Sequence, residues 1–171
     1  NGQYLFTAET PNGGREMWVT NLTSKGTHLL SDINPGLCGS SPESGTASAT
    51  QVANGWALFS AYEPKHGREL WITDGKGAWL VGDARQLPCL SSSPIDITAI
   101  GSGNAIFTAC DAVNGQEPWV FDFGKWHSLH VAGQDTAASI SLLKDVDPGC
   151  CSSFARDYTV IGDGHEHQSY G

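Results

Sequence analysis

The chain has 171 residues, and its 18 acidic residues outnumber 9 Lys and Arg to give a formal net charge of -9 at pH 7. Because no basic cluster offsets this acidity, nucleic acid and anionic membrane surfaces are poor partners. No apolar run approaches the roughly 18 residues that a spanning helix needs, so we expect no membrane insertion. The 21 Gly and six Trp favour short strands joined by tight turns, and almost no helix.

A short motif with a central Trp recurs three times along the chain. Its copies are Gly14-Arg15-Glu16-Met17-Trp18-Val19-Thr20-Asn21, Gly67-Arg68-Glu69-Leu70-Trp71-Ile72-Thr73-Asp74 and Gly115-Gln116-Glu117-Pro118-Trp119-Val120-Phe121-Asp122. A Phe precedes each Trp at one constant spacing, at Phe6, Phe59 and Phe107. The motifs are about 50 residues apart, a period that indicates a solenoid, a propeller or an array.

Alternating apolar and polar residues predict four strands in each unit. In the middle unit these are about 47–52, 56–62, 69–73 and 78–82, with turns at Asn54-Gly55 and Asp74-Gly75. A four-stranded antiparallel unit repeated at this period is typical of a propeller blade, and a lone sheet would leave both apolar faces in water. We therefore expect an all-β fold, a β-propeller with three four-stranded antiparallel blades in this chain, at about 1–45, 46–93 and 94–152.

Residues that recur in every unit are interpreted as structural. Aromatic side chains at fixed spacing indicate core packing more than ligand platforms, so the predicted repeat core is Phe6, Trp18, Phe59, Trp71, Phe107 and Trp119. The recurring Glu16, Glu69 and Glu117 are expected to accept hydrogen bonds or to pair with a basic neighbour. Pro118 cannot donate to a ladder, so its strand is expected to be bulged or irregular.

The motif at 67–75, together with Leu29-Leu30-Ser31-Asp32-Ile33-Asn34-Pro35-Gly36 after the first copy, resembles the ELWxxDGT repeat of bacterial extracellular proteins. The resemblance covers nearly the whole chain, is specific at 67–75 and good at 14–36, and is degraded in the third copy by Gln116, Pro118 and Phe121. It implies a β-propeller in an extracellular or secreted location. It brings no catalytic residues and no cofactor.

The two ends of the chain complement each other in this scheme. Asn1-Gly2 has the place of the first turn, so the first unit lacks its first strand, whereas Ala155–Ile161 has the pattern of an unpaired first strand. We expect this segment, within 153–162, to pair with Gln3–Ala8 of another chain, which closes a ring of two chains or builds a filament. Further blades outside this sequence are the alternative, and 163–171 is expected to be a tail.

Cysteines and a sequon suggest an oxidising compartment. Cys38, Cys89, Cys110, Cys150 and Cys151 lack zinc-site spacing, so disulfides are favoured, with the thiols on one face of the molecule. Asn21-Leu22-Thr23 is a candidate N-glycosylation site.

Features outside the repeat are the candidates for a specific function. An insertion at 124–139 carries Trp126, His127 and His130, which we interpret as a candidate ligand site or, equally, as a hairpin packed on its own blade. Asp163, His165 and His167 are a weak metal-site candidate, because alternate residues of an extended segment share a face, but a solvated tail is favoured.

No catalytic constellation is found in the sequence. The predicted function is therefore an extracellular, non-catalytic structural or adhesive assembly protein that forms homo-oligomers, without a cofactor. One alternative is a carbohydrate-binding, lectin-like propeller. Another is a propeller-fold hydrolase or lyase with carboxylates around the central channel.

Overall fold

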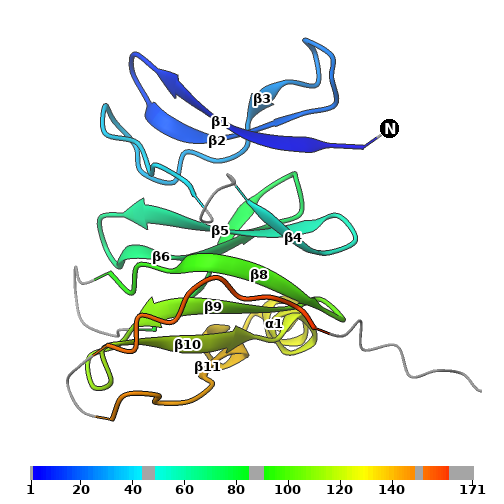
Figure 1. The fold of residues 1–171 in the computed structure, drawn as a ribbon. Helices are drawn as coiled ribbons and strands as arrows, with labels where there is room; N and C mark the ends of the chain where they lie inside the picture. The colour runs from blue at the N-terminus through cyan, green and yellow to red at the C-terminus, as the bar shows by residue number, and fades with distance from the viewer. Residues whose placement is uncertain (1, 44–48, 85–90, 149–151, 162–171) are drawn as a thin grey trace, which may run out of the picture.

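The computed structural model describes residues 2–43, 49–84, 91–148 and 152–161. They form an all-β molecule of three antiparallel sheets, stacked one upon another (Figure 1). The first sheet contains β1 (Tyr4–Thr10), β2 (Gly14–Thr20) and β3 (His28–Leu29), and the second contains β4 (Thr50–Ala53), β5 (Trp56–Glu63), β6 (Gly67–Thr73) and β7 (Ala78–Gly82). The third contains β8 (Ile95–Gly101), β9 (Asn104–Cys110), β10 (Gln116–Phe121) and β11 (Ile140–Leu142).

Each sheet is a meander in which consecutive strands are neighbours. The all-β prediction is confirmed, and the second and third sheets have four strands each, as expected. The hairpins β1–β2, β5–β6 and β9–β10 all turn at one end of the stack, at the left in Figure 1, while the short helix α1 (Phe123–Val131) lies at the opposite end. Because equivalent connections lie at the same end, the repeat in sequence is a repeat in space.

Strand pairing explains the constant spacing of the repeated aromatic residues. Each Phe lies directly opposite the Trp of its own unit in the neighbouring strand, in the pairs Phe6–Trp18, Phe59–Trp71 and Phe107–Trp119. A tight hairpin fixes this register, since cross-strand partners are equally far from the turn. The Trp of each unit in turn lies opposite Leu29, Leu80 or Leu142 on the last strand.

Two apolar clusters join the sheets. Met17 and Val19 of β2 pack against Phe59 and Ala61 of β5, which joins the first sheet to the second. A larger cluster joins the second sheet to the third and includes Leu58, Leu70, Ile72, Phe107, Trp119, Phe121 and Trp126. Successive side chains of a strand point to opposite faces. One face of the second sheet packs on the first sheet and the other packs on the third sheet. Both faces of the second sheet are therefore apolar.

Burial of the repeated Phe residues depends on that cover. Phe59 and Phe107 are buried, Trp119 is 9% exposed, and Trp18 and Trp71 are half-buried. Phe6 is also half-buried, since no described sheet lies over its face of the first sheet.

The insertion at 124–139, expected to be a loop or a hairpin, is instead helical. This segment forms α1 and a 3-10 turn, Ala137–Ser139. The side chain of Asp122 caps α1 by accepting a hydrogen bond from the backbone N–H of Lys125 at 2.9 Å. The helix forms because this cap and the burial of Trp126 stabilise it, two features that composition does not reveal.

The predicted irregularity at Pro118 was also wrong. Pro118 pairs with Thr108 in unbroken register. Its carbonyl accepts a hydrogen bond from Leu143 N–H at 2.9 Å, just beyond the end of β11. In an antiparallel ladder, the N–H and the C=O of a residue point toward the same neighbouring strand. The N–H that Pro118 lacks would therefore point toward β11, at the place where the β10–β11 ladder ends.

The predicted strand Ala155–Ile161 is not a strand in this structure. Residues 152–161 run across the third sheet on the face opposite Phe107, where the Thr108 hydroxyl contacts the Ala155 carbonyl and the Tyr158 hydroxyl. The segment has no neighbouring strand to pair with among the described residues.

Candidate functional site

The recurring Glu residues hold the linkers between sheets. Each Glu side chain is buried and accepts a hydrogen bond from the backbone N–H of a Ser in the linker that follows its sheet. The pairs are Glu16–Ser40 at 2.8 Å, Glu69–Ser92 at 2.7 Å and Glu117–Ser153 at 2.9 Å. In the first two pairs the Ser hydroxyl donates a second hydrogen bond to the same carboxylate. These carboxylates have their acceptor sites filled by the protein itself, as structural groups do.

Burial and hydrogen bonding act in opposite directions on these carboxylates. Burial raises the pKa of Glu69 to about 7, although its hydrogen bonds from Ser92 lower it in part. Burial also raises the pKa of Glu16, against the hydrogen bonds from Ser40 and Asn34. For Glu117, burial likewise raises the pKa, but hydrogen bonds from Ser153 and Val146 outweigh it and the net pKa is lowered.

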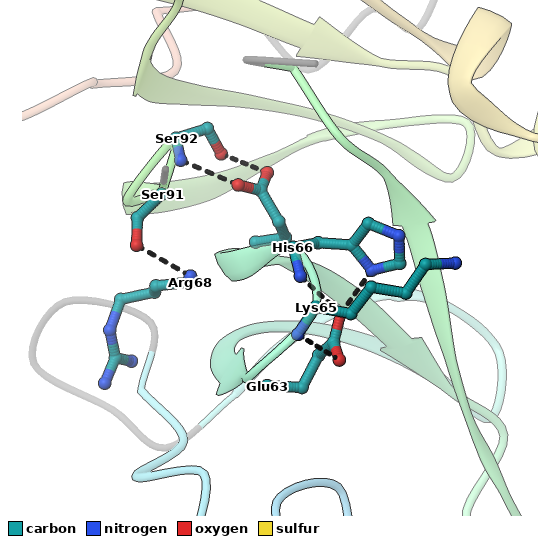
Figure 2. Close-up of polar contacts among 7 residues, drawn as sticks. Glu63, Lys65, His66, Arg68, Ser91 and Ser92 are labelled. Atoms are coloured by element: carbon teal, nitrogen blue, oxygen red, sulfur yellow. Dashed lines mark hydrogen bonds and ion pairs between the residues drawn. The ribbon is translucent and has the colours of Figure 1, made fainter. Parts of the chain in front are cut away.

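Polar contacts near Glu69 also fix the β5–β6 turn. Figure 2 shows the Glu63 carboxylate beside the His66 ring. The carboxylate also accepts hydrogen bonds from the backbone N–H groups of Lys65 and His66, at 3.0 and 2.8 Å. Arg68 donates its backbone N–H to the Ser91 hydroxyl at 2.8 Å. The His66–Glu63 pair is thus part of a turn.

Trp126 of the insertion belongs to the core. Its side chain is fully buried, and its ring centroid lies 5.1 Å from that of Trp56 and 6.4 Å from that of Trp79, both on the second sheet. His130 stacks on Trp126 at 4.6 Å and is half-buried, whereas His127 is exposed at the rim, 6.3 Å from Trp56. The insertion therefore bridges the second and third sheets. Sequence reasoning did not find Trp56 and Trp79, which lie outside the repeated motif.

As far as the described residues show, the first sheet presents an uncovered face and an open edge. Its aromatic face, defined here as Tyr4, Phe6, Trp18 and Leu29, is partly exposed, with Tyr4 at 53% and Leu29 at 37%. β1 is the edge strand of its sheet, paired only with β2 among the described residues.

A pocket of about 570 Å³ adjoins this open edge. It lies between the start of β1 and the β4–β5 hairpin of the second sheet, and its lining includes Gln3, Tyr4, Gln51, Asn54 and Trp56. Among the described residues that line it, none is Asp, Glu, Lys, Arg or His. An uncharged pocket with amide groups and aromatic rings suits peptide groups or neutral hydroxyl groups.

Only three of the remaining predicted site residues lie in the part of the chain that the structure describes. Cys38 is exposed, Cys110 is half-buried with its thiol 3.4 Å from the Asp111 carbonyl oxygen, and the two are not bonded to each other. Cys89, Cys150, Cys151, Asp163, His165 and His167 lie outside the described residues. Asn21 is exposed, and its side chain accepts hydrogen bonds from Thr23.

In the part of the chain that the structure describes, no three His, Cys, Asp or Glu side chains gather in a group that would hold a metal ion. No helix in the same part combines the length and apolar character needed to cross a bilayer.

Comparisons with protein-family models, with curated proteins and with solved structures gave no match.

Proposed function

We propose that this protein is a non-catalytic structural module of the extracellular space, whose sheets stack as propeller blades and whose copies associate end to end. The observation that carries the proposal is the half-buried Phe6, which is equivalent to the buried Phe59 and Phe107. In the second and third sheets a preceding sheet covers this position. A further sheet over Phe6 would bury it in the same way and so stabilise the assembly.

The other end of the stack offers a suitable cover. Phe59 is covered by Met17 and Val19 of the preceding sheet. The equivalent positions on the outer face of the third sheet, in the same places of the repeated motif, are Pro118, which is buried in this structure, and Val120, which is half-buried. The third sheet of one copy would therefore pack on the first sheet of the next, a head-to-tail contact that gives a ring if the rotation closes and a filament if it does not.

Self-association is the measurement that tests this proposal. In sedimentation velocity over a range of concentrations, the wild-type chain should associate and Phe6→Ser should remain monomeric, with its circular dichroism unchanged. Leu22→Ser is the matched control, because Leu22 is 75% exposed in a turn and lies outside the aromatic face. A wild-type chain that stays monomeric throughout would show the proposal to be wrong.

A second candidate function, carbohydrate binding, is favoured by the lining of the pocket beside β1. Amide groups of Gln51 and Asn54 beside the Trp56 ring provide the polar and aromatic contacts that sugars use. Titration with neutral oligosaccharides, monitored by Trp fluorescence, tests this candidate, and Gln51→Ala should weaken any binding.

A further inference from the structure

We infer that residues 155–161 of one copy add as a fourth strand along β1 of the next copy and fill the pocket there. The inference rests on the proposed function and names the segment that would complete the first sheet. Added strands gain main-chain hydrogen bonds from an open edge, and alternate side chains enter adjoining pockets.

The donor segment has the sequence and backbone of a first strand. Asp157-Tyr158-Thr159-Val160-Ile161 matches Asp96-Ile97-Thr98-Ala99-Ile100 of β8 in its Asp, Thr and Ile. Its backbone also matches at two left-handed positions: φ is 57° at Asp157 and 53° at Asp96, and 52° at Phe154 and 47° at Ser93. Such values are uncommon outside Gly, so their recurrence at both offsets indicates an equivalent chain path.

The linker before the segment is also held as in the other repeats. Glu117 binds Ser153 as Glu69 binds Ser92, and β8 begins three residues after Ser92. Residues 155–161 thus begin about as far after Ser153 as β8, a first strand, begins after Ser92.

The acceptor groove lies where the first strand of a sheet belongs. In the second sheet, β4 occupies that place and packs on β8, where the Thr50 hydroxyl donates to the Ile97 carbonyl at 2.9 Å. In the first sheet the corresponding place lies between the open edge of β1 and β4. The pocket is lined there by Gln3–Leu5 at the start of β1 and by Ala49 and Gln51 from the β4 side.

The existing sheets specify a register for the added strand. Thr50 lies opposite Leu58, and Thr98 lies opposite Ile106. By the same offsets, Thr159 would lie opposite Leu5 and Val160 opposite Tyr4.

Exposure and position also favour donation to a second copy. Val160 is 49% exposed and Ile161 is 100% exposed, as expected for apolar residues whose partner is absent. Thr108 holds the segment on the outer face of the third sheet, the face that the next copy would cover. Stacking of two copies and donation of the strand thus require the same arrangement, in which the outer face of the third sheet of one copy lies against the first sheet of the next.

The test combines full-length variants with a peptide. Neighbouring residues of a strand direct their N–H groups to opposite sides, so either Thr159→Pro or Val160→Pro removes a donor to β1. We expect that one of the two weakens self-association about tenfold or more, as loss of a ladder hydrogen bond and a clash with the edge would do. A proline placed in α1 as a control, such as Ser128→Pro, would break that helix. Leu22→Ser is therefore the control here as well.

The proline variant with the weaker self-association then serves as receptor for a synthetic peptide of residues 152–162. In ¹⁵N-labelled protein, the peptide should shift and protect the amides of residues 3–7, and a peptide with the same proline should not. If wild-type copies associate but neither proline variant weakens them and the peptide leaves these amides unchanged, the inference fails while the proposed function stands. Oligosaccharide bound in this pocket of the assembled wild type would also overturn it, since the strand would occupy that space. A monomeric wild type overturns donation by a second copy together with the proposed function.

Discussion

Glu69 accepts hydrogen bonds from both the backbone N–H and the hydroxyl of Ser92, and so joins β6 to the linker that leads into the third sheet. The carboxylate is fully buried, and burial raises its pKa to about 7 from an ordinary value of 4.5. Between these two values the folded state binds more protons than the unfolded state. The stability that protonated Glu69 contributes is therefore present below about pH 4.5 and is lost as the pH rises through about 7.

Glu69→Gln should remove this pH dependence, because the amide keeps the hydrogen-bonding shape of the protonated acid. We expect the free energy of unfolding of the wild type to fall by about 3 kcal/mol between about pH 4.5 and 8 from this group, and that of the variant to change by much less. Urea denaturation at several pH values measures both. Equal slopes for the two proteins in this range would contradict the burial of an ionisable Glu69.

Glu117→Gln provides the comparison of opposite sign. The pKa of Glu117 is lowered in the folded state, so its contribution is present above pH 4.5 and is lost as the pH falls through its folded pKa. The variant should therefore differ from the wild type mainly at neutral pH, in the same denaturation series.

Trp126→Ala should be among the most destabilising changes in the third sheet. The ring is fully buried between the second and third sheets, beside Trp56, Trp79 and His130. We expect a loss of about 3–5 kcal/mol in the free energy of unfolding, as for other large core truncations. His127→Ala, one residue further along α1 and exposed, should change it by about 0.5 kcal/mol or less. A small effect at Trp126 would indicate that the insertion packs outside the core.

Much of the fold could be predicted from the sequence because the repeat is encoded locally. The Phe and Trp spacing, the turn at Asn54-Gly55 and the alternation around Trp71 each depend on residues close together in the chain, and they predict the hairpins correctly. The partners of Trp126 could not be predicted, since Trp56 and Trp79 come from another sheet, at sequence distances that no local pattern fixes.

For the candidate site, the sequence identified residues more than it identified the contacts between them. The Ala155–Ile161 segment was predicted to be a strand, but a strand requires a neighbour, and the described chain contains none for it. The structural role of Glu69 was expected, whereas its linker Ser92 was not identified, because Ser-rich linkers offer many equivalent donors.

Thr108→Val should loosen the segment at 152–161 and leave the sheet intact. The Thr108 hydroxyl contacts both the Ala155 carbonyl and the Tyr158 hydroxyl, and the Val side chain has nearly the same shape without the hydroxyl. Loss of these contacts should raise amide hydrogen exchange in 154–161 about fivefold to tenfold, for about 1 kcal/mol of lost hydrogen bonding. Thr98→Val is the control, because its hydroxyl donates only to Asp96 two residues away, at 3.1 Å. Unchanged exchange in Thr108→Val would place the anchor of the segment elsewhere.

The glycines that open the first two copies of the motif, Gly14 and Gly67, are required by a close approach of two backbones, and Gly14→Ala tests this requirement. Gly14 has φ of 60°, and a Cβ there would lie 2.3 Å from Gly39 N and 2.7 Å from Leu37 O, atoms of the linker that Glu16 holds. Gly55 also has a positive φ, 78°, but nothing lies within 4 Å of its added Cβ. Gly55→Ala should therefore lose about 1 kcal/mol from backbone strain alone, whereas Gly14→Ala must also displace the linker and should lose about 3 kcal/mol or more. Urea denaturation of the two variants separates these contributions. Equal losses would mean that the motif glycine is present for its backbone conformation and not for the contact with the linker.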